Sequence, residues 1–239
     1  MFFLIRPSKI FLFSRLNRLL SKLRGDIGLD AGSANLKNRR MFQTKLYYGL
    51  DRNLDLLRAG LAKYNHGKTF GIYADMVKLD VLPDNSIDVL VTTNTLNHLN
   101  PDDRKLAIKH LCRLTKSHGH FLCEMSLDQD FDALAKMIKS YFENSDVIYY
   151  RNALSRFYEG IFERDGDLST HPIAGRRPFR LLAWLISRLE YLTCFWRVGN
   201  RHALIVCSGK IVQSSDEAFV LSDLPFIEPR IYKAMENPS

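Results

Sequence analysis

The sequence predicts an α/β fold built on a doubly wound, mainly parallel sheet. From Asp26 onward, short apolar runs alternate with stretches of helical periodicity, which is the pattern of repeated βα units. Three of these runs end in or run into an acidic residue: Asp30, Asp51 and Asp75. Because ligands bind at the carboxyl ends of the strands in such sheets, this recurrence also predicts where the functional site lies.

The predicted strands are short, rich in β-branched and aromatic residues, and bounded by turn residues. They comprise residues 27–33, 45–51, 69–75, 86–96, 120–126, 145–151 and 202–210. The run at 86–96, SIDVLVTTNTL, is a β-branched segment that ends in polar residues, as a buried strand does.

Helices are predicted between these strands from apolar spacing and end signals. They comprise residues 34–45, 53–64, 101–117 and 130–144. Asn53 is the expected N-cap of the second helix. The third begins with a proline and two aspartates, has basic residues in its last turn and is expected to stop at Gly119. Residues 152–200 exceed what a tight connection needs and are predicted to be an insertion.

Composition excludes disordered and fibrous classes, because 46% of the 239 residues are hydrophobic and 25% are charged. The cysteines lie in apolar stretches without metal-site spacing, which is typical of buried thiols in a reducing, cytoplasmic compartment. We expect neither an export signal nor a membrane span, since basic residues interrupt every apolar run before the roughly 18 residues that a span requires. An organelle transit peptide is the alternative interpretation of the basic start.

The net charge of +8 is concentrated in two segments, residues 1–24 and 171–202. This distribution argues against a nucleic-acid module whose basic face follows its core elements. We therefore divide the chain into a basic amphipathic helix (1–25), a main domain (26–210) with its insertion, and a C-terminal tail (211–239).

The spacing of the acidic residues favours a nucleoside ligand. Asp51 follows the turn Gly32-Ser33-Ala34 by about 20 residues, the position from which a carboxylate accepts hydrogen bonds from ribose hydroxyls. Asp75 would accept a bond from an adenine amino group. The turn lacks GxGxxG, which suits a nucleoside without a pyrophosphate. Strand-ending aspartates that only cap helices are the alternative interpretation for each residue alone.

Four segments together resemble the class I S-adenosylmethionine-dependent methyltransferases, in the small-molecule, methyltransferase type 11-like branch. They are LDAGSAN (29–35), YYGLDRN (47–53), YADMVKLDVLPDNSIDVLVTTNTLNHL (73–99) and GHFLCEMS (119–126). The resemblance covers residues 26–125 and continues more weakly to 210. It implies a Rossmann-like, seven-stranded doubly wound sheet with helices on both faces, an antiparallel last strand and a helical insertion before that strand.

The resemblance also implies which residues hold S-adenosylmethionine. They are Asp30, Gly32, Ser33, Ala34, Asp51, Arg52, Ala74, Asp75, Met76, Thr93 and Asn94. The chain departs from the family's GxGxG after Gly32, where it has Ser33 and Ala34. An alanine at position 34 is tolerated at negative φ but strains the turn or crowds the cofactor at positive φ.

The resemblance implies methyl transfer to a small acceptor. The aromatic insertion adds a lipid-linked acceptor, and transfer to oxygen is our hypothesis. We expect no metal ion, since no arrangement of His, Cys and carboxylate residues suggests one. A general base is needed where the acceptor must lose a proton, and His98 is our candidate, with His171 as a second. A histidine bonded only to a neighbour is the alternative. A methyltransferase-fold binding or scaffold protein without transfer is the competing function. A nucleic-acid methyltransferase is disfavoured, since no NPPY-like or DPPY-like motif follows the fourth strand.

The two basic segments have the pattern of interfacial helices that bind an anionic membrane surface. In residues 2–24, Ile10, Leu16 and Leu20 recur at helical spacing between basic residues. Residues 176–197 combine arginines with aromatic side chains that would also suit an apolar acceptor: Trp184, Tyr191, Phe195 and Trp196. Membrane association on the cytoplasmic side is the prediction; packing on the sheet, a lid helix or a homodimer contact is the alternative.

Overall fold

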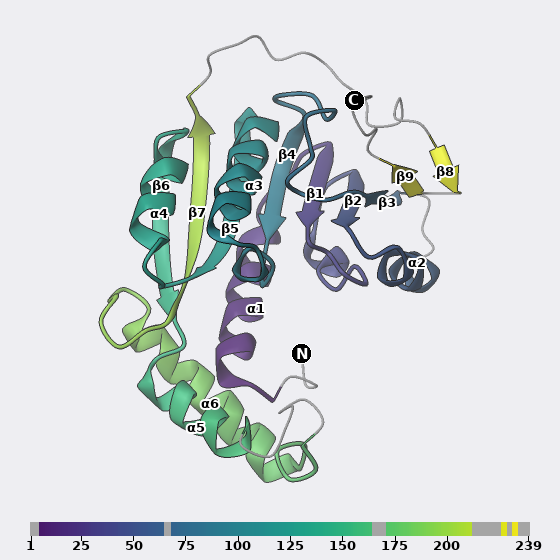
Figure 1. The fold of residues 1–239 in the computed structure, drawn as a ribbon. Coiled ribbons are helices and arrows are strands. Elements are labelled where there is room, and N and C mark those ends of the chain that lie inside the picture. The colour runs from purple at the N-terminus through teal and green to yellow at the C-terminus, as the bar shows by residue number, and fades with distance from the viewer. Residues whose placement is uncertain (1–4, 65–67, 164–170, 212–225, 229–230, 234–239) are drawn as a thin grey trace. The chain divides into compact units, whose positions relative to one another are not determined.

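The computed structural model describes residues 5–64, 68–163, 171–211, 226–228 and 231–233 (Figure 1). Its sheet has the strand order β6-β7-β5-β4-β1-β2-β3-β9-β8. The strands are β1 (Ile27–Ala31), β2 (Leu46–Asp51), β3 (Thr69–Tyr73), β4 (Ile87–Thr92), β5 (Thr115–Ser126), β6 (Phe142–Tyr150), β7 (His202–Lys210), β8 (Phe226–Glu228) and β9 (Ile231–Lys233).

The centre of the sheet is parallel, as the sequence predicts. β1 pairs in parallel with β2 and β4, β2 with β3, and β4 with β5. β7 runs antiparallel to β5, which confirms the predicted direction of the seventh strand. All five residues of β1 are buried, as expected for a central strand with covered faces. This arrangement brings the carboxyl ends of β1 to β4 to one edge.

The helices are α1 (Pro7–Leu20), α2 (Leu54–Lys63), α3 (Pro101–Leu114), α4 (Phe131–Lys139), α5 (Ala153–Glu163) and α6 (Arg177–Thr193), with short 3₁₀ turns η1 (Arg39–Met41) and η2 (Leu96–His98). Local signals predicted several ends correctly. Asn53 caps α2 by accepting a hydrogen bond from the Leu56 N–H. Asn100 caps α3 through the Asp103 N–H, with a proline in the first turn.

The predicted helix at 34–45 is wrong. Only the 3₁₀ turn η1 forms there, because Ala34 and Leu36 have left-handed φ angles of 47° and 58°, which an α-helix excludes. The predicted helix at 101–117 is also too long. Thr115 already pairs with Ile87 of β4, so strand pairing takes over three residues before the expected helix end.

The last predicted segment contains strands that sequence reasoning missed. β9 pairs in parallel with β3, and β8 pairs antiparallel with β9. Each has three residues, too few to show a periodicity. The rest of the expected tail beyond residue 211 lies outside the described residues.

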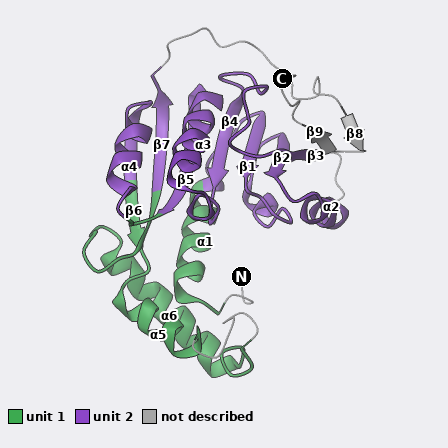
Figure 2. Cartoon of the chain, viewed as in Figure 1, with its two compact units in different colours: residues 1–19, 126–128, 147–204 green, residues 20–125, 129–146, 205–239 purple. Residues whose placement is uncertain are grey.

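The chain forms two compact units (Figure 2). Unit 2 comprises residues 20–125, 129–146 and 205–239 and contains the parallel centre of the sheet. Unit 1 comprises residues 1–19, 126–128 and 147–204. The N-terminal helix and the insertion, which the sequence presents as separate segments, thus belong to one unit.

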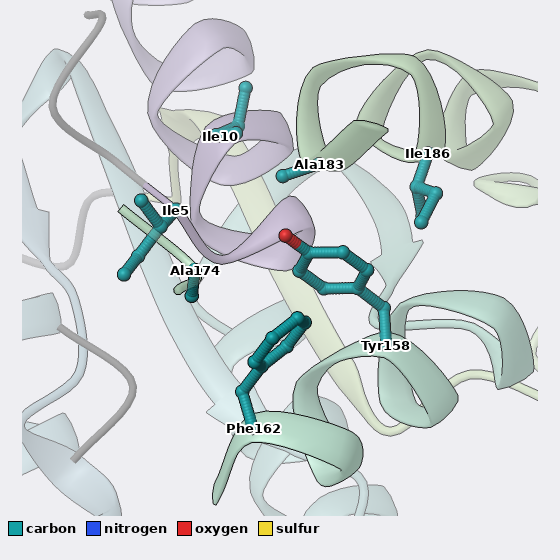
Figure 3. Close-up of a cluster of buried hydrophobic side chains, with 7 residues drawn as sticks. All are labelled: Ile5, Ile10, Tyr158, Phe162, Ala174, Ala183 and Ile186. Carbon is teal, nitrogen blue, oxygen red and sulfur yellow. The ribbon is translucent and has the colours of Figure 1, made fainter. Parts of the chain in front are cut away.

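Unit 1 has its own core, formed where α1, α5 and α6 meet. Figure 3 shows the cluster, whose members are Ile5, Ile10, Tyr158, Phe162, Ala174, Ala183 and Ile186. Phe11 of α1 is buried and packs its ring edge-on against Tyr191, with ring centroids 4.8 Å apart. Ile10 and Phe11 of α1 are therefore packed inside unit 1 and are not available to a membrane.

Two buried glutamates hold the helices of unit 1 together. The Glu159 carboxylate accepts hydrogen bonds from the hydroxyl and the backbone N–H of Ser8 and pairs with Arg151 at 2.9 Å. The Glu190 carboxylate accepts bonds from the Ser155 hydroxyl and the Asn152 N–H. Burial raises the pKa of Glu190, and the Ser155 bond opposes that rise. The carboxylates of Glu159 and Glu190 thus point into unit 1.

None of the helices that the structure describes is long and apolar enough to cross a membrane. The four cysteines are buried free thiols, in agreement with the sequence prediction.

Candidate functional site: the carboxyl edge of β1 to β4

The turn after β1 is shaped by Gly32. Its φ is +77°, and a Cβ there would lie 2.1 Å from Oγ1 of Thr95, so no other residue fits without displacing Thr95. The N–H groups of Gly32 and Ser33 both donate to the Leu50 carbonyl, at 2.8 and 3.0 Å. These bonds fix the turn directly beside the end of β2.

Asp51 ends β2 and organises the same turn. One carboxylate oxygen accepts a hydrogen bond from the Ala34 N–H at 2.7 Å, and the other accepts from the Asn53 N–H at 2.9 Å. Asp51 is half-buried. Each carboxylate oxygen has a second lone pair, so ribose hydroxyls could still donate to it.

The segment after β3 contributes Ala74, Asp75 and Met76. The Ala74 N–H donates to the Asp51 carbonyl at 3.2 Å, which ties this segment to the end of β2. The Asp75 carboxylate accepts from the Val77 N–H at 3.2 Å and is half-buried. Met76 is buried and provides an apolar wall.

The turn after β4 carries Asn94 in the left-handed region, with φ of 57°. Its N–H donates to the buried carboxylate of Glu124 at 2.7 Å. The Thr95 hydroxyl bonds to the Thr93 carbonyl, and the His98 N–H donates to the Thr95 carbonyl, each at 3.0 Å. His98 therefore lies on a braced turn, with an exposed side chain.

These turns surround a cavity of about 490 Å³, a size typical of small-molecule sites. It is lined by Gly32, Ala34, Leu50, Asp51, Arg52, Ala74, Asp75, Met76, Asn94, Thr95, His98 and Leu99. The sequence analysis missed Leu50, Thr95 and Leu99, although each lies within two residues of a predicted position. His171, the second candidate base, is in unit 1 and does not line this cavity.

Three predicted cofactor residues do not line the cavity. Asp30, Ser33 and Thr93 are buried beside it. Asp30 accepts hydrogen bonds from the Tyr47 hydroxyl at 2.9 Å and the Asn38 amide at 3.2 Å, and that amide lies 3.4 Å from the Thr93 hydroxyl. Asp30 thus lies outside the cavity lining and holds the adjoining segments through buried hydrogen bonds. Burial raises its pKa to about 6, while the two hydrogen bonds oppose the rise.

Asp30 makes stability depend on pH. Because its pKa is about 6 in the folded chain against 3.8 as the ordinary value, the folded state binds the proton more tightly. The protonated Asp30 carboxyl adds to the free energy of unfolding below pH 4. This stabilisation, of up to about 3 kcal/mol, is lost as pH rises to 6 and above. We expect urea unfolding at a series of pH values to show this decline for wild type relative to Asp30→Asn.

The Asp30→Asn variant should fold, because the unpartnered Asn38 Oδ1 could accept a bond from the new amide after Asn38 turns over. Identical pH profiles for the two proteins between pH 4 and 6 would contradict the role of Asp30.

Ala34 has the positive φ that the sequence analysis identified as the unfavourable case. The left-handed region costs an alanine about 1–2 kcal/mol, whereas glycine adopts it freely. Ala34→Gly should therefore raise the free energy of unfolding by up to about 1 kcal/mol, since relief of strain exceeds the added entropy of the unfolded chain.

Urea unfolding measures this change. Ala59→Gly is the matched control, because Ala59 is exposed within α2 and its replacement should lower stability by about 1 kcal/mol. Equal losses for both variants would show that position 34 is unstrained.

The comparisons with known proteins agree with this geometry. Residues 26–123 match the methyltransferase domain family, and this range contains every wall of the cavity. An uncharacterized methyltransferase of Bacillus cereus is 25% identical over 142 residues, which cover 56% of this chain and 65% of that protein. Residues 26–123 thus match a methyltransferase domain.

A second relative of this methyltransferase domain, from Bacillus thuringiensis, is 27% identical over 110 residues, covering 46% of this chain and 50% of that protein. The chain thus spans about half to two thirds of the length of these curated relatives.

Solved structures share the methyltransferase fold. A TehB-like S-adenosylmethionine-dependent methyltransferase from Corynebacterium glutamicum aligns with a TM-score of 0.53 at 14% identity, covering 82% of this chain and 86% of that one. The [4+2]-cyclase SpnF aligns with a TM-score of 0.55 at 14% identity, covering 81% and 80%. The N-methyltransferase NodS from Bradyrhizobium japonicum, solved with S-adenosylhomocysteine, gives 0.53 at 12% identity, covering 63% and 84%.

The methyltransferase cavity fits the cofactor of its family. Asp51 and Asp75 supply acceptors suited to ribose hydroxyls and an adenine amino group, and Leu50, Met76 and Leu99 supply apolar walls. Among the described residues, buried side-chain oxygens without a hydrogen-bond partner include Ser33 Oγ, Asn35 Oδ1 and Thr92 Oγ1, all in or beside the first turn or β4. None of these three residues lines the cavity, so they lie behind its walls.

Proposed function

We propose that this protein transfers a methyl group from S-adenosylmethionine to the oxygen of a small or lipid-linked acceptor. The observation that carries the proposal is the meeting of Asp51, Asp75 and His98 around one cavity within the methyltransferase domain. The cofactor supplies an electrophilic methyl group. The chain's residues would bind its ribose through Asp51 and its adenine through Asp75, in line with the resemblance.

An oxygen acceptor is supported by the position of His98. A hydroxyl must lose its proton as it is methylated, and an imidazole at the cavity is suited to receive that proton at a ring nitrogen. The braced turn from Thr93 to His98 would hold the imidazole in place, and Leu99 beside it would exclude water from the acceptor.

We further propose that the protein acts in the cytoplasm at the inner membrane surface. The free buried cysteines and the basic unit 1 support this location. The test is to supply radiolabelled S-adenosylmethionine to the pure protein together with either the chloroform-soluble or the aqueous extract of the source cells. Label in an extracted lipid or a small hydroxyl compound supports the proposal. Label only in amines would contradict the acceptor atom.

A binding or scaffold protein without transfer is the second candidate. It is favoured by the strained Ala34 turn and by the structural likeness to a protein described as a [4+2]-cyclase, whose activity is not methyl transfer. Tight calorimetric binding of S-adenosylmethionine with no label transferred from any extract would favour this candidate.

A further inference from the structure

The α6 helix of unit 1 exposes most of its large apolar residues and buries polar ones. Its buried positions are Ala183, Ile186, Ser187 and Glu190. Its exposed large apolar residues are Leu181, Leu182, Trp184, Leu185, Leu189 and Leu192. A helix of a soluble protein usually buries the larger apolar residues and exposes the polar ones, and here the pattern is reversed.

The exposed apolar surface extends over the neighbouring parts of unit 1. Phe157 and Ile161 of α5, which packs against α6, are 69% and 49% exposed. Directly after α6, Phe195 and Trp196 are 75% and 64% exposed. We call this surface the apolar face: Leu154, Phe157, Ile161, Leu181, Leu182, Trp184, Leu185, Leu189, Leu192, Phe195, Trp196 and Val198. Exposed apolar residues in such number on two packed helices and the segment that follows are typical of protein or membrane contacts.

The exposed charged residues of α6 are arginines. Arg177 and Arg188 are exposed on α6, and Arg188 stacks over the Trp184 ring at 4.8 Å. The described acidic residues of unit 1 are Asp128, Glu159, Glu163 and Glu190, of which Glu159 and Glu190 are buried and Glu163 pairs with Arg6 at 2.6 Å. The face therefore presents arginine and aromatic side chains together.

A basic groove lies at the margin of the apolar face, between α1 and α6. It has a volume of about 530 Å³ and is lined by Ser14, Asn17, Arg18, Arg188 and Tyr191. Two guanidinium groups with neighbouring hydroxyl and amide groups are suited to an anionic phosphate ester. Arg188 lines the groove and stacks over Trp184 of the apolar face, so the groove and the apolar face would meet the same partner.

We propose that the apolar face docks unit 1 onto an anionic lipid bilayer, with lipid phosphates in the groove of Arg18 and Arg188. Tryptophan, phenylalanine and leucine beside arginine are the composition that lies at the headgroup boundary. A second copy of this chain fits less well, because a twofold contact would set the arginines of each face against those of the other. The inference rests on the proposed function in that a lipid-linked acceptor would be met at this surface.

Vesicle binding by the full chain tests the docking, and it needs neither cofactor nor activity. We expect the protein to sediment with phosphatidylglycerol-rich vesicles and to bind pure phosphatidylcholine vesicles at least about tenfold more weakly. Phe195→Ser combined with Trp196→Ser should lower binding at least about tenfold, since both side chains are exposed and their loss spares the core. Leu106→Ser, at an exposed apolar residue of α3 in unit 2, should bind as wild type does.

Tryptophan fluorescence gives a second readout, because the chain has only two tryptophans and both lie in the apolar face. Their emission should shift to the blue on anionic vesicles. No shift, equal binding of the double variant, or a dimer in sedimentation equilibrium that the double variant dissociates would each overturn the proposal. A protein that methylates a water-soluble acceptor but ignores vesicles would overturn the docking and the membrane location while leaving methyl transfer intact. One that docks without binding S-adenosylmethionine would overturn the proposed methyl transfer alone.

Discussion

Asp51→Ala is expected to weaken S-adenosylmethionine binding by about 100-fold or more. The substitution removes the charged acceptor proposed for the ribose hydroxyls, and hydrogen bonds to a charged group are worth about 1.5–3 kcal/mol each. It also releases the Ala34 N–H, which Asp51 holds at 2.7 Å, so the first turn loses its brace. Isothermal titration calorimetry measures the affinities for S-adenosylmethionine and S-adenosylhomocysteine.

The matched control is Asp55→Ala. Asp55 lies four residues further on, in the exposed first turn of α2, and does not line the cavity. Its replacement should leave both affinities unchanged. Unaltered binding by Asp51→Ala would mean that the ligand of this cavity does not use the end of β2, and the assignment of the site would fail.

His98→Gln is expected to lower kcat by about 100-fold or more while leaving the affinity for S-adenosylmethionine unchanged. General base catalysis contributes roughly 10²–10⁴-fold, and glutamine keeps the size and polarity of the side chain without accepting a proton. Rates are measured as formation of S-adenosylhomocysteine with the acceptor identified in the extract assay.

His118→Gln is the control for this experiment, because His118 is exposed in unit 2 and does not line the cavity. A variant at position 98 with wild-type kcat would show that the acceptor needs no base from this residue. An amine acceptor, which can be methylated in its neutral form, would give that result.

The sequence predicted the edge of the sheet more accurately than the turns on it. Asp51 and Asp75 could be placed because alternation and spacing locate strand ends, and parallel strands bring those ends together. The left-handed conformation of Ala34 could not be predicted, since the Ala34 N–H is held by the Asp51 carboxylate from the next strand. The helix predicted at 34–45 failed for the same reason.

The amphipathic patterns of α1 and α6 look alike in sequence but have different outcomes. Phe11, Leu12 and Leu16 of α1 are buried, whereas Leu185, Leu189 and Leu192 of α6 are exposed. A pattern shows that a face is apolar, but the packing partner is chosen by residues distant in sequence. Here the inward-facing Glu159 and Glu190, with their serine partners, fix which sides of α5 and α6 are buried.

The hydrogen bond between Ser8 and Glu159 joins residues that are 151 positions apart in sequence. During synthesis, Ser8 is therefore made long before its partner. The strands β1 to β5 can emerge from the ribosome and pair with near neighbours in sequence, while α1 is already made and its partners α5 and α6 are not. Until they appear, Ile10 and Phe11 lack the side chains of α5 and α6 that they pack against in the folded chain. Contacts this distant form late and slowly, so these apolar residues of the nascent chain stay uncovered by those helices until residues 153–193 have been made, while the basic side chains of α1 favour its solubility.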